Sequence, residues 1–468
     1  MNSQVVGAVA PSSKRRVMVA STVGTVMEWY DFNLYGLASA LIFGPLIFGS
    51  SSVGATLASF ATFAVGFAAR PIGGIVLGHL GDRIGRKSVL VFTMFGMGIA
   101  TALVGLLPTY AQIGVWAPIL LIALRILQGF AVGGEFAGAT LLTIENAPEG
   151  KRGLFGAIPA MGTGAGFVLA SAVFALVSLL PNDAFLTWGW RIPFLISIAL
   201  VAFGVWLRRG ITDTPVFEKL EAEGKRERFP VLAVIRTQPG AIVRTLGITI
   251  SGFAFGYMVQ SFSLNYGVNT VGVSRSTMLW AVACASALEI ASIPFWGWLS
   301  DKIGRKVMVS IGLVFTILYI FPFFWMLNTG NTGLIFLAMI FALPIAKDMV
   351  FGPQAALVAE LFDSRVRFSG VSLGRELGGA IFGGTAPFIA TAILAASGSI
   401  TGVAMYVIIA CTVTLIAVLT GRELSKRTMT HVKELDDLPT LSAPNPNAAE
   451  ATITATASAN ATKRFPSS

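Results

Sequence analysis

The sequence reads GHLGDRIGRK at residues 78–87, and a close copy, GWLSDKIGRK, stands at residues 297–306. Seven of the ten residues are identical, and the two copies lie 219 positions apart. A second feature follows each copy. Glu145 recurs 215 positions later as Glu360, and an arginine follows each glutamate by seven residues. Coincidental loop charges would not repeat in this order, so the chain is predicted to consist of two similar halves.

The composition indicates that both halves span a membrane. Of the 468 residues, 54% are hydrophobic and 12% are charged, and the mean hydropathy is +0.76. Soluble domains have about 25% charged residues, so the composition excludes a soluble enzyme, a secreted disulfide-linked protein and a largely disordered chain. One membrane-spanning helix needs about 20 apolar residues, and the apolar blocks have room for about twelve such helices. We expect these spans near residues 17–43, 55–78, 89–107, 116–142, 154–179, 192–208, 241–268, 276–299, 307–327, 332–358, 369–395 and 401–420.

The net charge of +10 is unevenly distributed over the ends of the spans. Of the 33 Lys and Arg residues, 24 lie at one set of alternating span ends, whereas the opposite ends hold only Arg191 and Arg275. Cytoplasmic loops of membrane proteins are enriched in Lys and Arg. The asymmetry therefore predicts a multi-pass protein with both termini in the cytoplasm, and the location that we expect is the bacterial plasma (inner) membrane. Because topology explains the positive charge, no nucleic-acid partner is expected.

The expected fold is an all-α polytopic membrane protein with twelve transmembrane helices in two pseudo-symmetric six-helix halves. Both cysteines, Cys284 and Cys411, lie in apolar spans, so neither a disulfide nor a metal site is expected. The sequence has no Walker motif, and no cofactor is expected. We divide the chain into a cytoplasmic segment (1–16), an N-terminal half (17–208), a cytoplasmic central loop (209–240), a C-terminal half (241–420) and a cytoplasmic, disordered tail (421–468).

Several stretches, together with the repeated decapeptide, resemble a known family of transporters. They are EWYDF at 28–32, RPIGG at 70–74, QGFAVGGE at 128–135, WGWRIP at 188–193, GPQ at 352–354 and ELF at 360–362. The chain resembles the major facilitator superfamily and, more narrowly, its metabolite:proton symporters, which include transporters of dicarboxylates, shikimate-like acids and proline or betaine. This resemblance implies a major facilitator fold. It also implies proton-coupled import of a small organic acid or zwitterion by alternating access.

The repeated loops are expected to form a latch on the cytoplasmic side, an expectation that rests largely on the family resemblance. In each half, an aspartate at a span end lies close to where a neighbouring helix can present its N-terminus. A carboxylate at such a terminus stabilises the folded protein by roughly 0.3–1 kcal/mol. The arginine four residues later can reach a glutamate at the end of another span. These contacts would favour the outward-open state and break when the halves rock; alternatively, the basic loops only set the topology. The gating residues are Asp82, Arg86, Glu145, Asp301, Arg305 and Glu360.

Charged residues within the spans of the N-terminal half are candidates for proton coupling, because a charge in the bilayer is costly. Glu28 and Asp31 stand three residues apart on one helical face. Two carboxylates this close should not both ionise in a low dielectric, so one is expected to carry a proton. Arg125, Gln128 and Glu135 share a face of the fourth span. We predict Glu28, Asp31 and Glu135 as proton-coupling residues; a static ion pair with Arg125 is the alternative.

Four residues are predicted to bind the substrate, namely Arg125, Gln128, Gln260 and Arg375. Arg375 and the Lys347–Asp348 pair depart from the family pattern, and a cation there is a candidate ligand for a second carboxylate. Neighbours on a helix diverge by about 100°. We therefore do not expect both members of the Lys347–Asp348 pair, or both Arg375 and Glu376, to point into one cavity.

Two other functions are compatible with the predicted fold. An exporter is the nearest, but exporters often carry Gly-Pro in the fifth span, whereas residues 156–166 read GAIPAMGTGAG. A solute sensor would signal through the central loop or the tail, and neither segment resembles a signalling domain. An enzyme is not expected, since the spans contain no metal-binding set and no Ser/His pair. The expected partners are a small metabolite, protons and the lipid bilayer, and we expect a monomer.

Overall fold

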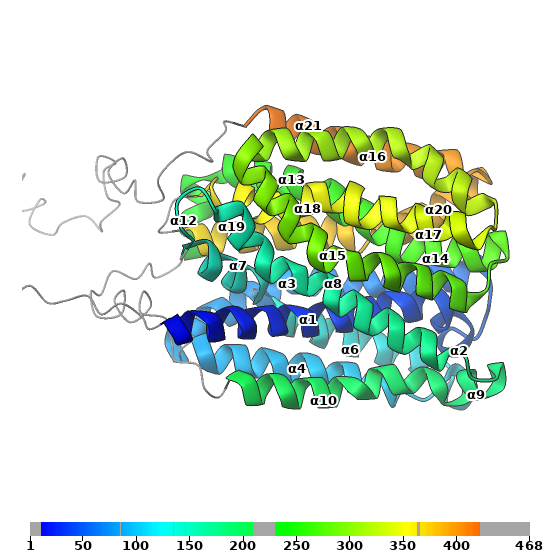
Figure 1. The fold of residues 1–468 in the computed structure, drawn as a ribbon. Coiled ribbons are helices and arrows are strands. Elements are labelled where there is room, and N and C mark those ends of the chain that lie inside the picture. Colours follow the sequence, from blue (N-terminus) through cyan, green and yellow to red (C-terminus); the bar gives the residue numbers. More distant parts are fainter. Residues whose placement is uncertain are drawn as a thin grey trace, which may run out of the picture. The chain divides into compact units, whose positions relative to one another are not determined.

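The computed structural model describes residues 11–84, 86–133, 135–145, 147–208, 230–362 and 366–421, which belong to one compact unit. Within these ranges the regular secondary structure is entirely helical. The long helices run back and forth along a common direction and turn at its two ends (Figure 1). The predicted tail (421–468) lies outside the described residues except for Gly421, as do residues 1–10 and 209–229.

The helices of the N-terminal half lie close to their predicted spans. The six predicted spans correspond to α1 (Pro11–Leu41), α3 (Val53–Ile84), α4 (Arg86–Gly105), α6 (Trp116–Val132) with α7 (Glu135–Glu145), α8 (Arg152–Val177) and α10 (Ile192–Arg208). The short elements α2 (Phe43–Ile47), α5 (Tyr110–Ile113), α9 (Asn182–Thr187) and η1 (Gly189–Arg191) connect them at the end opposite the start of α1.

The C-terminal half has the same number of spans, and three of them contain π-helical turns. The spans are α13 (Pro239–Tyr257) with η2 (Met258–Phe262), α14 (Ser263–Tyr266) and η3 (Gly267–Val271); α15 (Arg275–Ile303); α16 (Arg305–Asn328); α17 (Thr332–Ile340) with η4 (Phe341–Lys347) and α18 (Asp348–Ala359); α19 (Arg367–Gly378) with η5 (Gly379–Gly383) and α20 (Ala386–Ser397); and α21 (Ile400–Leu419). The segments η2, η3, η4 and η5 are the π-helical turns. Such turns are rare and often mark functional sites.

Nine helices of the described ranges are long and apolar enough to cross a membrane, and two shorter apolar helices accompany them. Local signals explain where several spans begin and end. The Ser274 side chain accepts the Thr277 N–H at the start of α15, which caps that helix. Gly304 ends α15 at a φ of +98°, a backbone conformation that residues with a Cβ rarely adopt.

Two boundaries differ from the predicted ones. The first helix begins at Pro11, within the segment expected to precede the membrane. The last part of the predicted central loop forms α12 (Pro230–Thr237), which buries Val234 and packs against α19. The physical reason is that the charged run of the loop ends before residue 230, and the following apolar residues can form an amphipathic turn.

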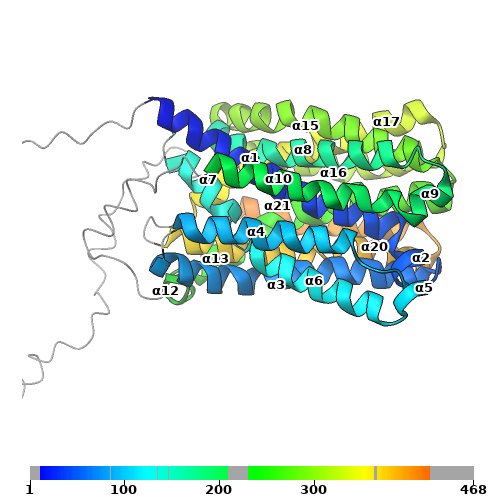
Figure 2. The ribbon, with the colours of Figure 1, turned by 90° about the horizontal axis from the view of Figure 1, so that it is seen from below.

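The two halves lie in separate layers that meet along two seams (Figures 1 and 2). One seam joins α8 to α15, and the other joins α3 to α19, η5 and α20. Because α3 repeats as α15 and α8 repeats as α19–α20, the two seams are equivalent under the internal repeat. Small residues allow close packing there: a Cβ added to Gly153 of α8 would lie 2.4 Å from the Gly297 carbonyl oxygen of α15.

Candidate functional site

A small cavity of about 20 Å³, roughly the room that one water molecule needs, lies between the halves. Helices α1 and α8 contribute residues from the N-terminal half, and α13, η2, η4 and α18 contribute the rest. The lining consists of Trp29, Thr163, Phe167, Gly252, Phe253, Gly256, Tyr257, Gln260, Lys347, Phe351 and Gln354. Five of these side chains are aromatic, and Lys347 alone is charged. Gln260 is the predicted ligand that lines the cavity.

Several polar atoms of the lining have no hydrogen-bond partner among the described residues. They are Trp29 Nε1, Thr163 Oγ1, Tyr257 Oη and Gln260 Nε2, and all four are buried. By contrast, Gln354 Nε2 donates to the Ile248 carbonyl at 3.2 Å. Buried polar groups in proteins nearly always have partners, often water or a ligand. These four atoms are therefore suited to bind the hydroxyl or carboxyl groups of a solute.

A cluster of charged residues, here called the arginine cluster, lies beside the cavity and crosses the α3–α19 seam. Arg70 of α3 contacts Glu28 of its own half at 3.2 Å and Glu376 of the other half at 3.5 Å. Arg375 contacts its neighbour Glu376 at 2.8 Å, and its guanidinium lies 3.6 Å from the Phe136 ring centre in α7. The seven members are Glu28, Asp31, Arg70, Arg125, Glu135, Arg375 and Glu376, and at most 5% of each residue is exposed.

Arg125 and Asp31 form the part of this cluster that lies deepest in the N-terminal half. The Arg125 guanidinium donates to the Gln128 amide oxygen, and Gln128 Nε2 lies 2.6 Å from Thr101 Oγ1. Asp31 is within hydrogen-bonding reach of Thr101 and interacts electrostatically with Arg125. A Cβ on Gly66 would lie 2.3 Å from Arg125 Nε, so only glycine leaves room for this guanidinium.

The structure brings the predicted coupling residues Glu28, Asp31 and Glu135 into one cluster, but three of the four predicted substrate ligands do not line the cavity. Glu135 lies close enough to Glu28 for their charges to interact. Arg125, Gln128 and Arg375, predicted as substrate ligands, interact with other protein groups, and none of the three lines the cavity.

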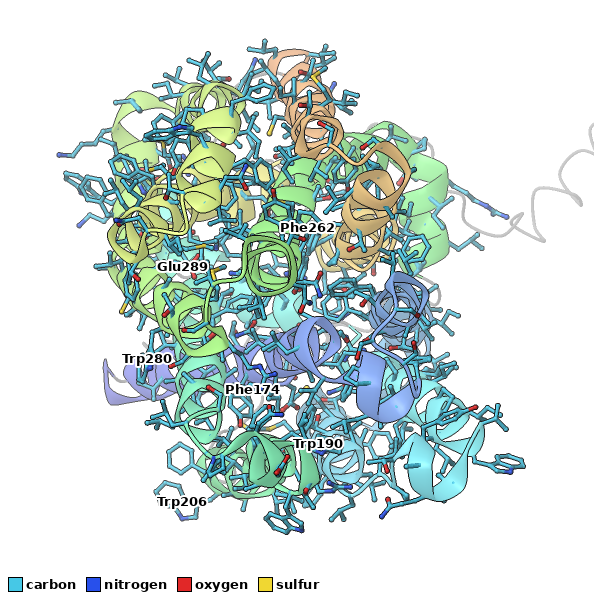
Figure 3. All side chains as sticks on the ribbon, turned by 90° about the vertical axis from the view of Figure 1, so that its right-hand side faces the viewer. Phe174, Trp190, Trp206, Phe262, Trp280 and Glu289 are labelled. Carbon is cyan, nitrogen blue, oxygen red and sulfur yellow. The ribbon has the colours of Figure 1, made fainter. Side chains whose placement is uncertain are left out.

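A second group of charges, here called the lysine cluster, consists of Glu289, Lys347 and Asp348. Lys347 Nζ lies 2.5 Å from Glu289 Oε1 and 3.0 Å from Asp348 Oδ1. Ser292 donates to Asp348 Oδ2 at 2.5 Å. In the view down the helices, Glu289 lies among them, whereas Trp206 lies at the rim of the bundle (Figure 3).

The expectation that both members of an adjacent charged pair do not point into one cavity agrees with the structure, since Lys347 lines the cavity whereas Asp348, Arg375 and Glu376 do not. The two members of each pair nevertheless contact each other. Lys347 contacts Asp348, and Arg375 contacts Glu376. Long Lys and Arg side chains can bend back along the helix, so the direction of the Cβ does not fix where the charge lies. For Lys347, the π turn of η4 also ends at this residue.

Sequence reasoning missed Arg70, Glu289 and Glu376 as site residues. A signal was present for two of them, since Arg70 and Glu289 stand 219 positions apart, the offset of the repeated decapeptide. They occupy matching places on α3 and α15, at the centres of the two clusters. The signal for Glu376 is that a charge stands within the predicted span 369–395.

The contacts predicted for the second copy of the latch are present at the end of the bundle where α1 begins. Asp301 accepts the Gly153 and Leu154 N–H groups at 2.8 and 2.9 Å, at the start of α8. Arg305 contacts Asp301 at 3.2 Å and Glu360 at 3.1 Å, and Arg152 lies 3.7 Å from Glu360. The side chains of the first copy, Asp82, Arg86 and Glu145, lie outside the described part of the structure.

The halves also contact each other at the opposite end. Asn265 Nδ2 of α14 donates to the Ala40 carbonyl of α1 at 2.8 Å. The Arg275 guanidinium of α15 lies 4.7 Å from the Phe185 ring centre in α9. Contacts between the halves therefore lie on both sides of the cavity.

Comparison with known proteins agrees with this architecture. The sequence profile described as Major Facilitator Superfamily matches residues 17–383 and, in a second match, 240–455. The shikimate transporter of Escherichia coli (strain K12) is 39% identical over 418 residues, 88% of this chain and 95% of that protein. The ectoine/proline transporter ProP of Corynebacterium glutamicum is 34% identical over 439 residues, 90% of this chain and 86% of that protein.

The fold is similar to that of the xylose transporter XylE from E. coli, in a partially occluded inward-open conformation. The TM-score is 0.69 at 18% sequence identity, over 89% of this chain and 100% of that chain. The predicted family and the predicted twelve-helix fold are confirmed. This chain belongs to the Major Facilitator Superfamily and is a multi-pass membrane protein.

Proposed function

We propose that this protein is a proton-coupled symporter that imports a small hydroxylated carboxylic acid by alternating access. The observation that carries the proposal is the cavity lining, in which one cation, Lys347, stands among aromatic rings and unpartnered polar atoms. A solute with one carboxylate, several hydroxyl groups and a small apolar ring face complements this lining. Shikimate, named for the E. coli relative, has this chemistry. The protein is a transporter and not an enzyme.

The arginine cluster supports proton coupling through its charge balance. Its four carboxylates and three guanidinium groups leave one surplus negative charge in a buried place. One proton neutralises that surplus, and a neutral cluster is less costly to keep buried in the membrane interior. We assign the proton to Glu28, Asp31 or Glu135. Because Arg125, Gln128 and Arg375 do not line the cavity, we assign them to coupling rather than to direct ligation, and Gln260 remains the proposed ligand.

The described contacts are those of an occluded carrier, with the halves touching on both sides of the cavity. In our proposal, the latch end faces the cytoplasm, because 24 of the Lys and Arg residues lie at that set of ends. Opening inward then requires release of Asp301 from the start of α8 and of Glu360 from Arg305. The protein works as a monomer in the bacterial inner membrane. An exporter is not favoured, since α8 lacks a Gly-Pro pair.

The first test is external pH in a lightly buffered suspension of de-energised cells that produce the protein. Shikimate, other hydroxy acids, dicarboxylates, betaine and proline are added separately, and cells without the protein serve as the blank. Alkalinisation by hydroxy acids alone, abolished by a protonophore, supports the proposal. Alkalinisation by betaine or proline alone would show that the substrate is a zwitterion and not a hydroxylated acid. No response together with no uptake of labelled shikimate would refute acid symport.

The ligand role of Gln260 has a matched control. Gln260→Ala should raise the KM for the acid roughly two- to tenfold, the usual worth of one hydrogen bond. Gln112→Ala changes an exposed glutamine that caps α5 at the far end of the bundle, so its KM should stay at the wild-type value. If the KM of Gln260→Ala equals that of Gln112→Ala, Gln260 does not bind the acid.

A further inference from the structure

We propose that Glu289, Lys347 and Asp348 form a second proton-binding site, which controls Lys347 as the ligand for the solute carboxylate. This inference rests on the proposed function, and it adds a second proton to the transport cycle. The cluster lies in the C-terminal half, apart from the arginine cluster. When a proton binds one of the two carboxylates, that carboxylate no longer holds the Lys347 ammonium as an ion-pair partner. The carboxylate of the solute then binds the ammonium instead.

The first argument is the number of donors and acceptors. The two carboxylates have about eight lone-pair positions. The groups available to fill them are the Lys347 ammonium and the hydroxyls of Ser292 and Ser286, about five N–H and O–H donors in all. Acceptors therefore exceed donors. An added proton turns one acceptor into a donor and reduces the mismatch.

The second argument is charge. Two carboxylates and one ammonium leave one surplus negative charge, and Glu289 and Asp348 are fully buried. An uncompensated charge in the membrane interior is costly. A single proton cancels the surplus while Lys347 stays charged. The lysine cluster, like the arginine cluster, therefore needs one proton to become neutral.

The third argument is isolation, because no charge outside the cluster, among the residues that the structure describes, balances the surplus. Within the described residues, the charged groups that act on Glu289, Lys347 and Asp348 are one another. Helix α8 presents Gly164 to Glu289, and α13 presents Gly256 to the Lys347 stem.

The remaining elements around the lysine cluster bring titratable or polar groups that are engaged elsewhere. Tyr319 of α16, packed on Phe341 of η4, donates its hydroxyl to the Ala338 carbonyl at 3.0 Å. Tyr257 of α13 interacts with the arginine cluster. Helix α1 faces this side of the cavity with Trp29, packed against Phe351.

The fourth argument is position. Lys347 lines the cavity, and its ammonium lies 5.0 Å from the Phe351 ring centre. A solute in the cavity therefore meets this cation directly. Glu289 also matches Arg70 under the internal repeat, so the two clusters are centred on equivalent places of the two seams.

The test measures the proton-to-solute ratio in proteoliposomes without a membrane potential. With two protons per monoanion, a gradient of one pH unit supports roughly hundredfold accumulation, and with one proton roughly tenfold. Wild-type protein should approach the higher limit. Glu289→Gln, Asp348→Asn or both should fall to the lower limit while still exchanging labelled for unlabelled acid, which shows that they fold. If neither variant lowers the limit, the inference is refuted.

Lys347 is tested separately, by binding. Lys347→Gln should raise the concentration of acid needed for half-maximal thermal stabilisation at least tenfold, and Lys347→Arg should restore part of it. Wild-type affinity in Lys347→Gln would refute the ligand role. A wild-type protein that accumulates no acid with protons would refute the proposed function itself, so the two failures are distinguishable.

Discussion

Arg70 is 1% exposed and contacts one carboxylate from each half of the molecule. Its guanidinium also lies 3.7 Å from the Phe32 ring centre, which favours a cation at this place. Breaking a buried ion pair by removing one partner costs much more than the pair contributes, because the other charge remains buried. We therefore expect a change at Arg70 to alter both the free energy of unfolding and the proton coupling.

Replacing Arg70 by Gln should destabilise the protein by about 3–5 kcal/mol, because Glu28 and Glu376 then lose their shared cation. Thermal unfolding in detergent measures the change. The double variant Arg70→Gln/Glu376→Gln should recover part of the loss, since one unpaired carboxylate is removed with it. If the double variant is as unstable as the sum of the single ones, the contact across the seam has no energetic role.

Asp31→Asn and Glu135→Gln test where the first proton binds. The variant at the proton-carrying residue should lose uptake driven by a pH gradient and keep exchange of labelled for unlabelled solute, because exchange needs no net proton movement. Accumulation ratio and exchange rate are measured on the same vesicles. Normal accumulation in both variants would place the first proton on Glu28 or refute its assignment to this cluster.

At the scale of elements, the sequence predicts helices well and their irregularities poorly. Charged residues and glycines mark the span ends, so α15 was expected at 276–299 and is found at Arg275–Ile303. The π turns have no such mark. An apolar stretch such as Phe341–Lys347 has the same pattern in an α or a π turn, and packing against neighbouring helices decides between them. The contacts of Lys347 depend on that choice, which is why they were not predictable.

The latch contact that is easiest to test joins the end of α15 to the start of α8. Asp301→Asn removes the negative charge that binds two backbone N–H groups. A loss of about 1.4 kcal/mol would raise the inward-open population roughly tenfold. In a background without Cys284 and Cys411, maleimide labelling of Ala355→Cys from the cytoplasmic side should accelerate accordingly. Asp183→Asn, an exposed acid of α9 at the far end, is the control, and equal labelling of the two variants would refute the latch.

At the scale of the whole molecule, the repeated decapeptide predicts two similar halves, whereas the latch was expected largely from the family resemblance. The cavity was less accessible to prediction. Its lining comes from six elements of both halves, and only Gln260 and the candidate cation Lys347 were expected among those residues. Periodicity places a residue on a helix face, but the seam that the face meets depends on how twelve helices pack.

Two protons carried with a monoanion would make transport electrogenic, and this can be measured directly. A potential of 100 mV, negative inside, contributes about 2.3 kcal/mol for the one net charge and should raise accumulation roughly fiftyfold. Vesicles with a potassium gradient and valinomycin provide the potential. Variants Glu289→Gln and Asp348→Asn provide the comparison, because the one that removes the second proton should also remove the voltage response. A wild-type protein indifferent to voltage would carry a single proton per monoanion.

Arg70 and Glu289 occupy the same register in the two halves and bear opposite charges. Such a pair points to an ancestral gene duplication followed by divergence. A carrier assembled from two copies of one half would hold two arginines or two glutamates at this place, and it would lack one of the two clusters. Neither half can now replace the other, so a working carrier needs one copy of each.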